Sequence, residues 1–255
     1  MAAEATGSRV HKTLDEKVWG VHHNTARVAC GILAGNCFHT PYFALDQYGV
    51  FGVDLGPEDL LIEKEYYFII PGNLASFRDW IFPHEDLEDI WPHDPASRND
   101  LHCSITGDWG VAVALVPETE EHWYISNGMT VSRPKSRDQV DADTPMPLPI
   151  PIHSRGNTIY LKPSLHKHFH AGSFTIVPKL TLTGMEYVMT VLSNYAEDPE
   201  EPWALFNGKP ARPFYAGSKR QLFARFGWTV FVHSNSRIGF GPGDEQDQEL
   251  NHPYT

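Results

Sequence analysis

The chain has 255 residues, a formal net charge of −12 at pH 7 and an apolar fraction of 41%, which is an ordinary globular composition. It contains no continuous apolar stretch long enough to span a bilayer, so we expect no membrane partner. Residues 1–17 are polar and lack the apolar segment of a secretory signal. We therefore expect a cytoplasmic protein, with the nucleus as the alternative. Residues 1–10 should be a disordered lead-in and residues 11–255 one compact unit.

The charge is distributed unevenly along the chain. Residues 54–100 hold 12 acidic residues against Lys64, Arg78 and Arg98. A surface this acidic repels phosphates at long range, so we expect no nucleic acid among the partners. Segment 144–185 is the exception, because it has four Lys or Arg residues and no acid. The sequence says nothing about the oligomeric state.

Three cysteines, Cys30, Cys37 and Cys103, form no CxxC pair and no even framework. This spacing is typical of free thiols in a reducing compartment.

The first half of the chain predicts short elements separated by turns. Small and apolar residues over 26–34 predict a buried helix. Segments 48–55 and 65–70 predict strands, and Pro71-Gly72 predicts a turn after the second. Residues 77–95 combine acids, tryptophans and prolines, and predict a loop with at most one short helix.

The middle of the chain predicts a strand over 109–116 and a short helix over 118–127 with Trp123 and Tyr124 facing inward. Four prolines alternate with apolar residues over 145–151, which favours an extended strap packed against its own domain.

The last third predicts three further strands, over 157–161, 174–178 and 186–193. Between the first two, 163–170 predicts a helix with proline in its first turn. Residues 218–225 predict a second helix, with a capping box from Ser218 to Gln221 and an apolar face that docks on the core.

The pair Asn157 and His166 suggests a catalytic site, because a strand carrying an amide side chain leads into a helix that presents an imidazole. In a ββα-metal nuclease, such a helix helps to hold a divalent cation on the scissile phosphate, and a strand histidine takes a proton from water. Seven stretches of the chain carry a resemblance to a known family: Trp80–Trp91 (WIFPHEDLEDIW), Cys103–Gly107 (CSITG), Leu115–Pro117 (LVP), His122–Met129 (HWYISNGM), Asn157–Phe169 (NTIYLKPSLHKHF), Phe174–Lys179 (FTIVPK) and Leu222–Trp228 (LFARFGW).

In this order, the seven stretches resemble the fungal HNH-nuclease-domain family over residues 20–233. The resemblance implies an α+β fold in which an HNH-like ββα core, at about 101–180, is embedded in a larger mixed single domain. Segments 11–100 and 181–240 would then be family-specific additions.

The chain differs from this family at positions that the family uses for catalysis. The family has its general-base histidine two residues before a Val-Pro pair, and this chain has Ala114 there. The family's helix reads Asp-Leu-His and then Phe-Asp, whereas this chain has Ser164 and His170 in place of the two aspartates. Alanine cannot accept a proton, so the resemblance implies a degenerate site.

We accordingly expect a site without metal or other cofactor. The candidate catalytic residues are His166, Asn157 and Asn127, and the candidate substrate-binding residues are Ala114, Trp123, Tyr124 and His170. Each has a structural alternative. Asn157 could pin a turn, Asn127 could cap a helix, and the two aromatic residues could belong to the core. His166 and His170 share a helix face and could bind a metal.

Three functions remain open at this point. The expected one is a repurposed HNH-like protein that binds a small apolar molecule and acts as a cyclase or pericyclase of fungal secondary metabolism, by conformational templating and hydrogen bonding. One alternative is a metal-dependent endonuclease with an unusual base. The other is an inactive interaction protein that uses its acidic segment 54–100 as the contact surface.

Overall fold

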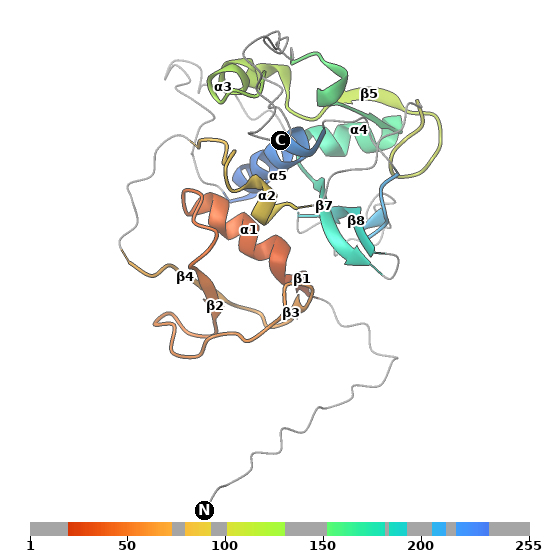
Figure 1. Ribbon diagram of the computed structural model, residues 1–255. Helices are drawn as coiled ribbons and strands as arrows, with labels where there is room; N and C mark the ends of the chain where they lie inside the picture. The colour runs from red at the N-terminus through yellow and green to blue at the C-terminus, as the bar shows by residue number, and fades with distance from the viewer. Residues whose placement is uncertain are drawn as a thin grey trace, which may run out of the picture.

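The computed structural model describes residues 20–72, 80–92, 101–130, 152–181, 184–192, 206–212 and 218–234, and they form a mixed α+β fold (Figure 1). The described helices are α1 (His23–Leu33), α2 (Leu87–Ile90), α3 (Glu121–Ser126), α4 (Pro163–His170) and α5 (Ser218–His233). The described strands are β1 (Val21–His22), β2 (Tyr42–Ala44), β3 (Leu60–Leu61), β4 (Tyr67–Ile69), β5 (Val111–Ala114), β6 (Thr158–Leu161), β7 (Phe174–Thr181) and β8 (Gly184–Val191). They pair antiparallel as β1–β3, β2–β4, β5–β6 and β7–β8. The expected α+β class is confirmed.

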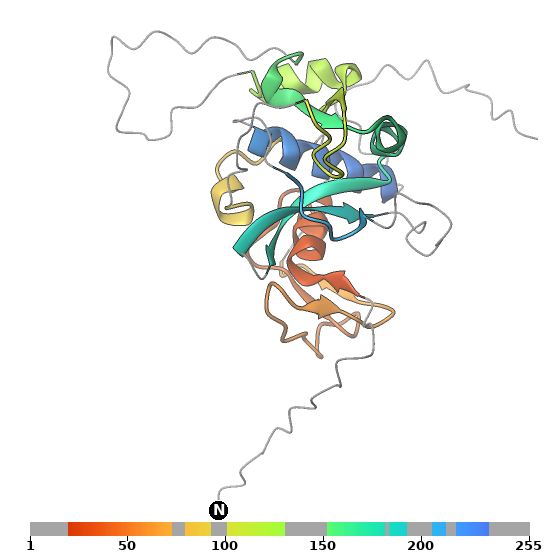
Figure 2. The same cartoon turned by 90° about the vertical axis from the view of Figure 1, so that its right-hand side faces the viewer.

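Helix α5 packs against β7 and α1 in the centre of the described fold (Figures 1 and 2). The predicted apolar face of this helix is buried, since Leu222, Phe223 and Phe226 are at most 1% exposed. The helix does not stop near residue 225 as predicted but continues to His233, because Val230 and Phe231 are also buried in the core.

Gly227 lets α5 approach Trp80 closely. A Cβ atom at position 227 would lie 2.7 Å from Cη2 of Trp80, which is too close for any side chain. A glycine inside a helix costs about 1 kcal/mol relative to alanine. Here the cost is offset by the indole of Trp80, which is 4% exposed and lies directly against the helix.

Stacked and tilted aromatic rings fill the core. Trp80 and Trp123 stack with ring centroids 5.2 Å apart and an interplanar angle of 6°. Trp91 lies edge-on to Phe223 at 5.2 Å, and its Nε1 donates to the Tyr187 hydroxyl at 3.0 Å. These contacts join segment 80–91 to α3, α5 and β8.

The N-terminal part bears out two predicted elements and contradicts one. The helix expected over 26–34 is α1, and the strand expected over 65–70 is β4. Segment 48–55, expected to be a strand, is a loop with one isolated bridge at Gly52. The carboxylate of Asp46 accepts from three backbone amides of this loop, so these amides do not pair with a neighbouring strand.

The predicted strands and helices of the second half occur as β5, α3, β6, α4, β7 and β8, within a few residues of their expected bounds. The predicted role of Gln221 in a capping box is wrong, because its side chain does not bond back to the start of α5. Gln221 Nε2 donates to the Tyr124 hydroxyl at 3.1 Å, and Gln221 Oε1 has no partner among the described residues. All three cysteines are free, as expected. The expected lead-in over 1–10 and the strap over 145–151 lie outside the described residues.

None of the described helices has the length and hydropathy that a bilayer crossing requires.

Candidate functional site

Strands β5 and β6 and helix α4 form the unit on which most of the predicted site residues lie. The two strands pair antiparallel, with Val111 opposite Leu161 and Ala114 opposite Thr158. Only Lys162 separates β6 from α4, and the helix packs against both β5 and β7. Proline at 163 suits the first position of α4, because that amide has no acceptor within the helix. The described part of the chain therefore contains an antiparallel strand pair followed directly by a helix.

Ala114 is the last residue of β5 and is partly buried. Its methyl group can neither donate nor accept a hydrogen bond, so this position supplies shape and apolar surface alone. The backbone continues the pairing one residue further, since the amide of Leu115 donates to the carbonyl of Asn157 at 2.8 Å.

His166 and His170 lie one turn apart on α4 with their ring centroids 4.6 Å apart and tilted by 55°. His166 is partly buried and His170 is exposed. Partial burial lowers the pKa of His170, and the nearby charges of His166 and Arg225 lower it further. A neutral imidazole at position 170 offers one N–H donor and one acceptor nitrogen at neutral pH.

The side chain of Asn157 is completely buried and fully engaged with the backbone. Its Oδ1 accepts from the amide of Val116 at 2.8 Å, and its Nδ2 donates to the carbonyl of Val116 at 2.9 Å and to that of Ile152 at 2.7 Å. These bonds hold the segment after β5 against the segment before β6. Asn157 thus positions the end of β5, and direct contact with a substrate stays a prediction.

The other three predicted residues lie on or next to α3, in a different environment. Asn127 follows the helix, and its Oδ1 accepts from the amide of Phe82 at 2.7 Å while its Nδ2 donates to the carbonyl of Trp123 at 3.0 Å. Trp123 is 2% exposed, and its Nε1 donates to the carbonyl of Trp80. Tyr124 is fully buried.

The predicted site residues therefore fall into two groups. Ala114, Asn157, His166 and His170 belong to the unit formed by β5, β6 and α4. The side-chain hydrogen bonds of Asn127, Trp123 and Tyr124 to other elements include bonds with segment 80–82 and with α5. Trp123 and Tyr124 are buried, as expected for core residues, whereas Asn127 is partly buried. A substrate contact of Trp123 or Tyr124 would require the core to open, and such a contact stays a prediction.

Arg225 is a residue that the sequence analysis missed. It lies on α5 and is 1% exposed, with its guanidinium carbon 3.9 Å from the ring centroid of Phe169 and 4.3 Å from that of Trp228. Nη2 donates to the carbonyl of Phe169 in the last turn of α4, whereas Nε and Nη1 have no partner among the described residues. Burial lowers the pKa of Arg225 to about 9. A lone cation inside the apolar stretch 222–228 was the available signal.

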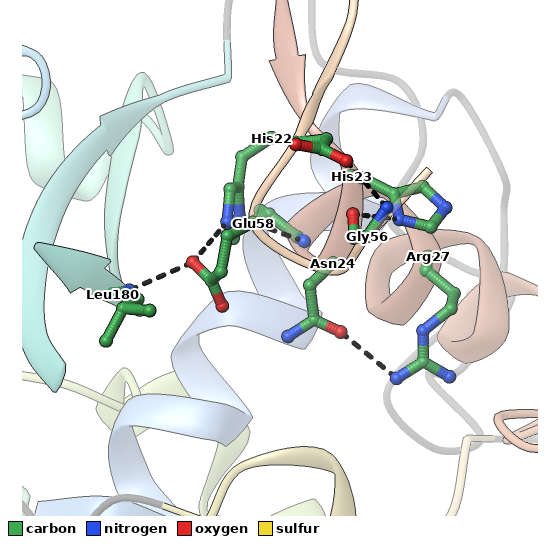
Figure 3. A network of polar contacts seen from close by, with 9 residues as sticks. His22, His23, Asn24, Arg27, Gly56, Glu58 and Leu180 are labelled. Atoms are coloured by element: carbon green, nitrogen blue, oxygen red, sulfur yellow. Dashed lines mark hydrogen bonds and ion pairs between the residues drawn. The ribbon is translucent and has the colours of Figure 1, made fainter. Parts of the chain in front are cut away.

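A second polar cluster, around His22, was also missed (Figure 3). Nε2 of His22 lies 2.9 Å from Oε2 of Glu58, and Nδ1 lies 2.8 Å from the hydroxyl of Thr25. Oε2 of Glu58 also accepts from the amide of Leu180 at the end of β7. Threonine, histidine and glutamate in this order resemble a nucleophile, a base and an orienting acid.

The burial of the His22 cluster favours a structural role over that chemistry. Thr25 is 5% exposed and His22 is 7% exposed, so a substrate cannot reach the hydroxyl. The amide of Thr25 also donates to Nδ1 of His22, which makes the imidazole the N-terminal cap of α1. The cluster therefore joins α1, the loop at Glu58 and the end of β7.

His166 and His170 on α4 are of a type that binds metal ions. Within the described residues, no three or more His, Cys, Asp or Glu side chains are grouped so that they could hold a metal ion. His166 and His170 supply two nitrogen donors. The expectation of a site without a metal stays a prediction.

Comparison of the chain with protein-family models, with curated proteins and with solved structures gives no significant match.

Proposed function

We propose that this chain is a repurposed HNH-like protein that binds a small, mainly apolar organic molecule at the face formed by β5 and α4. The observation that supports this best is that α4, which carries the adjacent imidazoles of His166 and His170, packs against β5, the strand that ends at Ala114. An apolar surface with a few convergent hydrogen-bonding groups is the usual character of a small-molecule site.

The proposed reaction is a cyclisation or a related pericyclic rearrangement of an unsaturated carbonyl compound. Such a reaction needs the reacting carbons held together in a productive conformer and a donor that polarises the carbonyl oxygen. His166 and His170 would supply the N–H donor. Asn157 would act as a positioning residue, because it fixes the end of β5, the strand against which α4 packs. No proton has to be removed from water in this reaction, so Ala114 is not an obstacle.

The test is binding of simple conjugated dienones and quinones to the full chain, monitored through the imidazole and backbone signals in two-dimensional NMR spectra. We expect saturable shifts at α4 that weaken about tenfold in His166→Ala or His170→Ala. His168→Ala is the matched control on the same helix and should bind normally. Binding that does not depend on either of the two histidines would exclude this site.

A metal-dependent nuclease is the second candidate, and the order of β5, β6 and α4 with a helix histidine is the observation that favours it. Supercoiled-plasmid nicking with magnesium, manganese, zinc and nickel separates the two. If the natural protein nicks and His166→Ala does not, the nuclease is correct. If only Ala114→His nicks, a metal site is still present without its base. We expect neither protein to cut.

A further inference from the structure

The loop that follows β2 presents a group of apolar side chains to solvent. Relative exposures are 52% for Leu45, 80% for Tyr48, 72% for Val50 and 66% for Phe51. Single exposed apolar residues are common on protein surfaces, but four within seven residues are not scattered. We call Leu45–Phe51 the apolar loop. It lies at the end of the molecule that carries β2 and β4, away from α3 (Figures 1 and 2).

The apolar loop is held in one conformation by its own polar groups. The carboxylate of Asp46 accepts from the amides of Tyr48, Val50 and Phe51 at 2.9, 3.2 and 2.6 Å. These bonds lower the pKa of Asp46, so the carboxylate remains charged. The amide of Leu45 donates to the carbonyl of Phe51 at 2.9 Å and closes the loop. A loop whose backbone is fixed in this way loses little backbone conformational entropy on binding.

The surroundings of the apolar loop are strongly acidic. Between Tyr42 and Ile69 the chain has six carboxylates and one lysine. Four of the carboxylates are on exposed residues: Asp54, Asp59, Glu63 and Glu65. Glu65 and Asp46 both raise the pKa of Tyr67 on β4, Glu65 by a hydrogen bond and by its charge and Asp46 by its charge, so both carboxylates lie close to the Tyr67 hydroxyl.

We infer that the apolar loop docks a partner protein whose recognition segment carries apolar side chains flanked by lysine or arginine. The four exposed apolar side chains supply the apolar contact. The exposed carboxylates of Asp54, Asp59, Glu63 and Glu65, which we call the acidic rim, select a basic partner by charge complementarity. This surface is separate from the proposed small-molecule site and does not depend on it.

The same charges argue against other occupants. Anionic lipid headgroups and nucleic acid phosphates would be repelled by the acidic rim. A second copy of the chain placed symmetrically would bring two acidic rims together. A basic segment is the occupant that the charge pattern favours.

The experiment compares two synthetic amphipathic peptides that share one leucine and tryptophan face and carry either lysine or glutamate flanks. Fluorescence anisotropy with the full chain should show binding of the lysine peptide, which weakens at high salt, and at least about tenfold weaker binding of the glutamate peptide. Phe51→Ser should weaken binding of the lysine peptide about tenfold. Ile125→Ser is the matched control, because Ile125 is 56% exposed on α3.

Several outcomes would overturn the inference. One is equal affinity for the two peptides, and another is an equal loss of binding in Ile125→Ser and Phe51→Ser. A dimer in analytical ultracentrifugation that Phe51→Ser dissociates would assign the loop to a second copy. Sedimentation with phosphatidylcholine vesicles that Phe51→Ser abolishes would assign it to a membrane. Glu63→Gln with Glu65→Gln tests the rim separately and should weaken only the lysine peptide.

Discussion

Asn157 binds both backbone groups of Val116, a residue 41 positions earlier in the chain, through its side-chain amide. The amide imitates a neighbouring backbone and pairs as a strand would. A third bond, to the carbonyl of Ile152, uses its second amide proton. One buried side chain thus closes the segment between β5 and β6 at its base.

Replacing Asn157 by alanine should destabilise the protein strongly, because three buried backbone groups lose their partner. Each unsatisfied group costs about 1–3 kcal/mol, so we expect the free energy of unfolding to fall by at least about 3 kcal/mol. Urea denaturation measures this. Asn207→Ala is the control, since Asn207 is exposed and accepts one bond, from the amide of Val191, and it should cost about 1 kcal/mol or less. Equal losses in the two variants would contradict the structural role of Asn157.

Gly227→Ala should destabilise the protein although alanine is the better helix former. The added Cβ would lie 2.7 Å from Trp80 Cη2, and overpacking of this kind costs about 1–3 kcal/mol. The higher helix propensity of alanine stabilises the helix by about 1 kcal/mol, so we expect the free energy of unfolding to fall by about 1 kcal/mol net in thermal unfolding. Gly156→Ala meets only Ser154 Oγ, at 3.7 Å, and should change stability by less than about 0.5 kcal/mol. A stabilised Gly227→Ala would show that Trp80 does not lie against α5.

His22 should make the stability fall at mildly acid pH. Burial holds the pKa of His22 below its ordinary value of 6.5, although the bond to Glu58 opposes the shift. Well above pH 6.5 the imidazole is neutral in both states and adds no pH dependence. Below it, the unfolded chain binds a proton that the folded chain resists, so the free energy of unfolding falls until the folded pKa is reached, by at most about 1.4 kcal/mol per pH unit.

The variant His22→Gln tests this pH dependence, because glutamine can still accept from Thr25 and does not titrate. We expect a lower overall stability but a flatter slope of the free energy of unfolding between pH 7 and the folded pKa. His153→Gln is the control, since the His153 side chain is 65% exposed. An unchanged slope in His22→Gln would assign the pH dependence to other groups.

The three thiols should differ in reactivity. Burial raises the pKa of the Cys30 thiol to about 11, and Cys103 is fully buried. Only a thiolate reacts readily with iodoacetamide, so Cys37 should be alkylated first at neutral pH and the other two only on unfolding. Mass spectrometry of peptides gives the order. Early labelling of Cys30 in the folded protein would show that its helix opens locally.

Local sequence patterns were sufficient for most of the helices and strands. Proline 163 and the apolar positions 165 and 169 define α4, and its predicted bounds agree with the observed ones. The buried apolar face of α5 follows in the same way from Leu222, Phe223 and Phe226. The prediction of a strand over 48–55 is wrong. Its apolar residues favour a strand, but the hydrogen bonds from its amides to the Asp46 carboxylate produce a loop.

The sequence alone determined the α+β class, the order of strand, strand and helix around α4, and the residue types at positions 114, 157, 166 and 170. These properties depend on hydrophobic periodicity and on turn residues, which act over a few neighbouring positions. Only the tertiary structure decided that Arg225 packs between Phe169 and Trp228, that His22 meets Glu58, and that Phe51 faces solvent. Each of these depends on which distant segments meet, and on the free energy of burying or exposing a side chain at that contact.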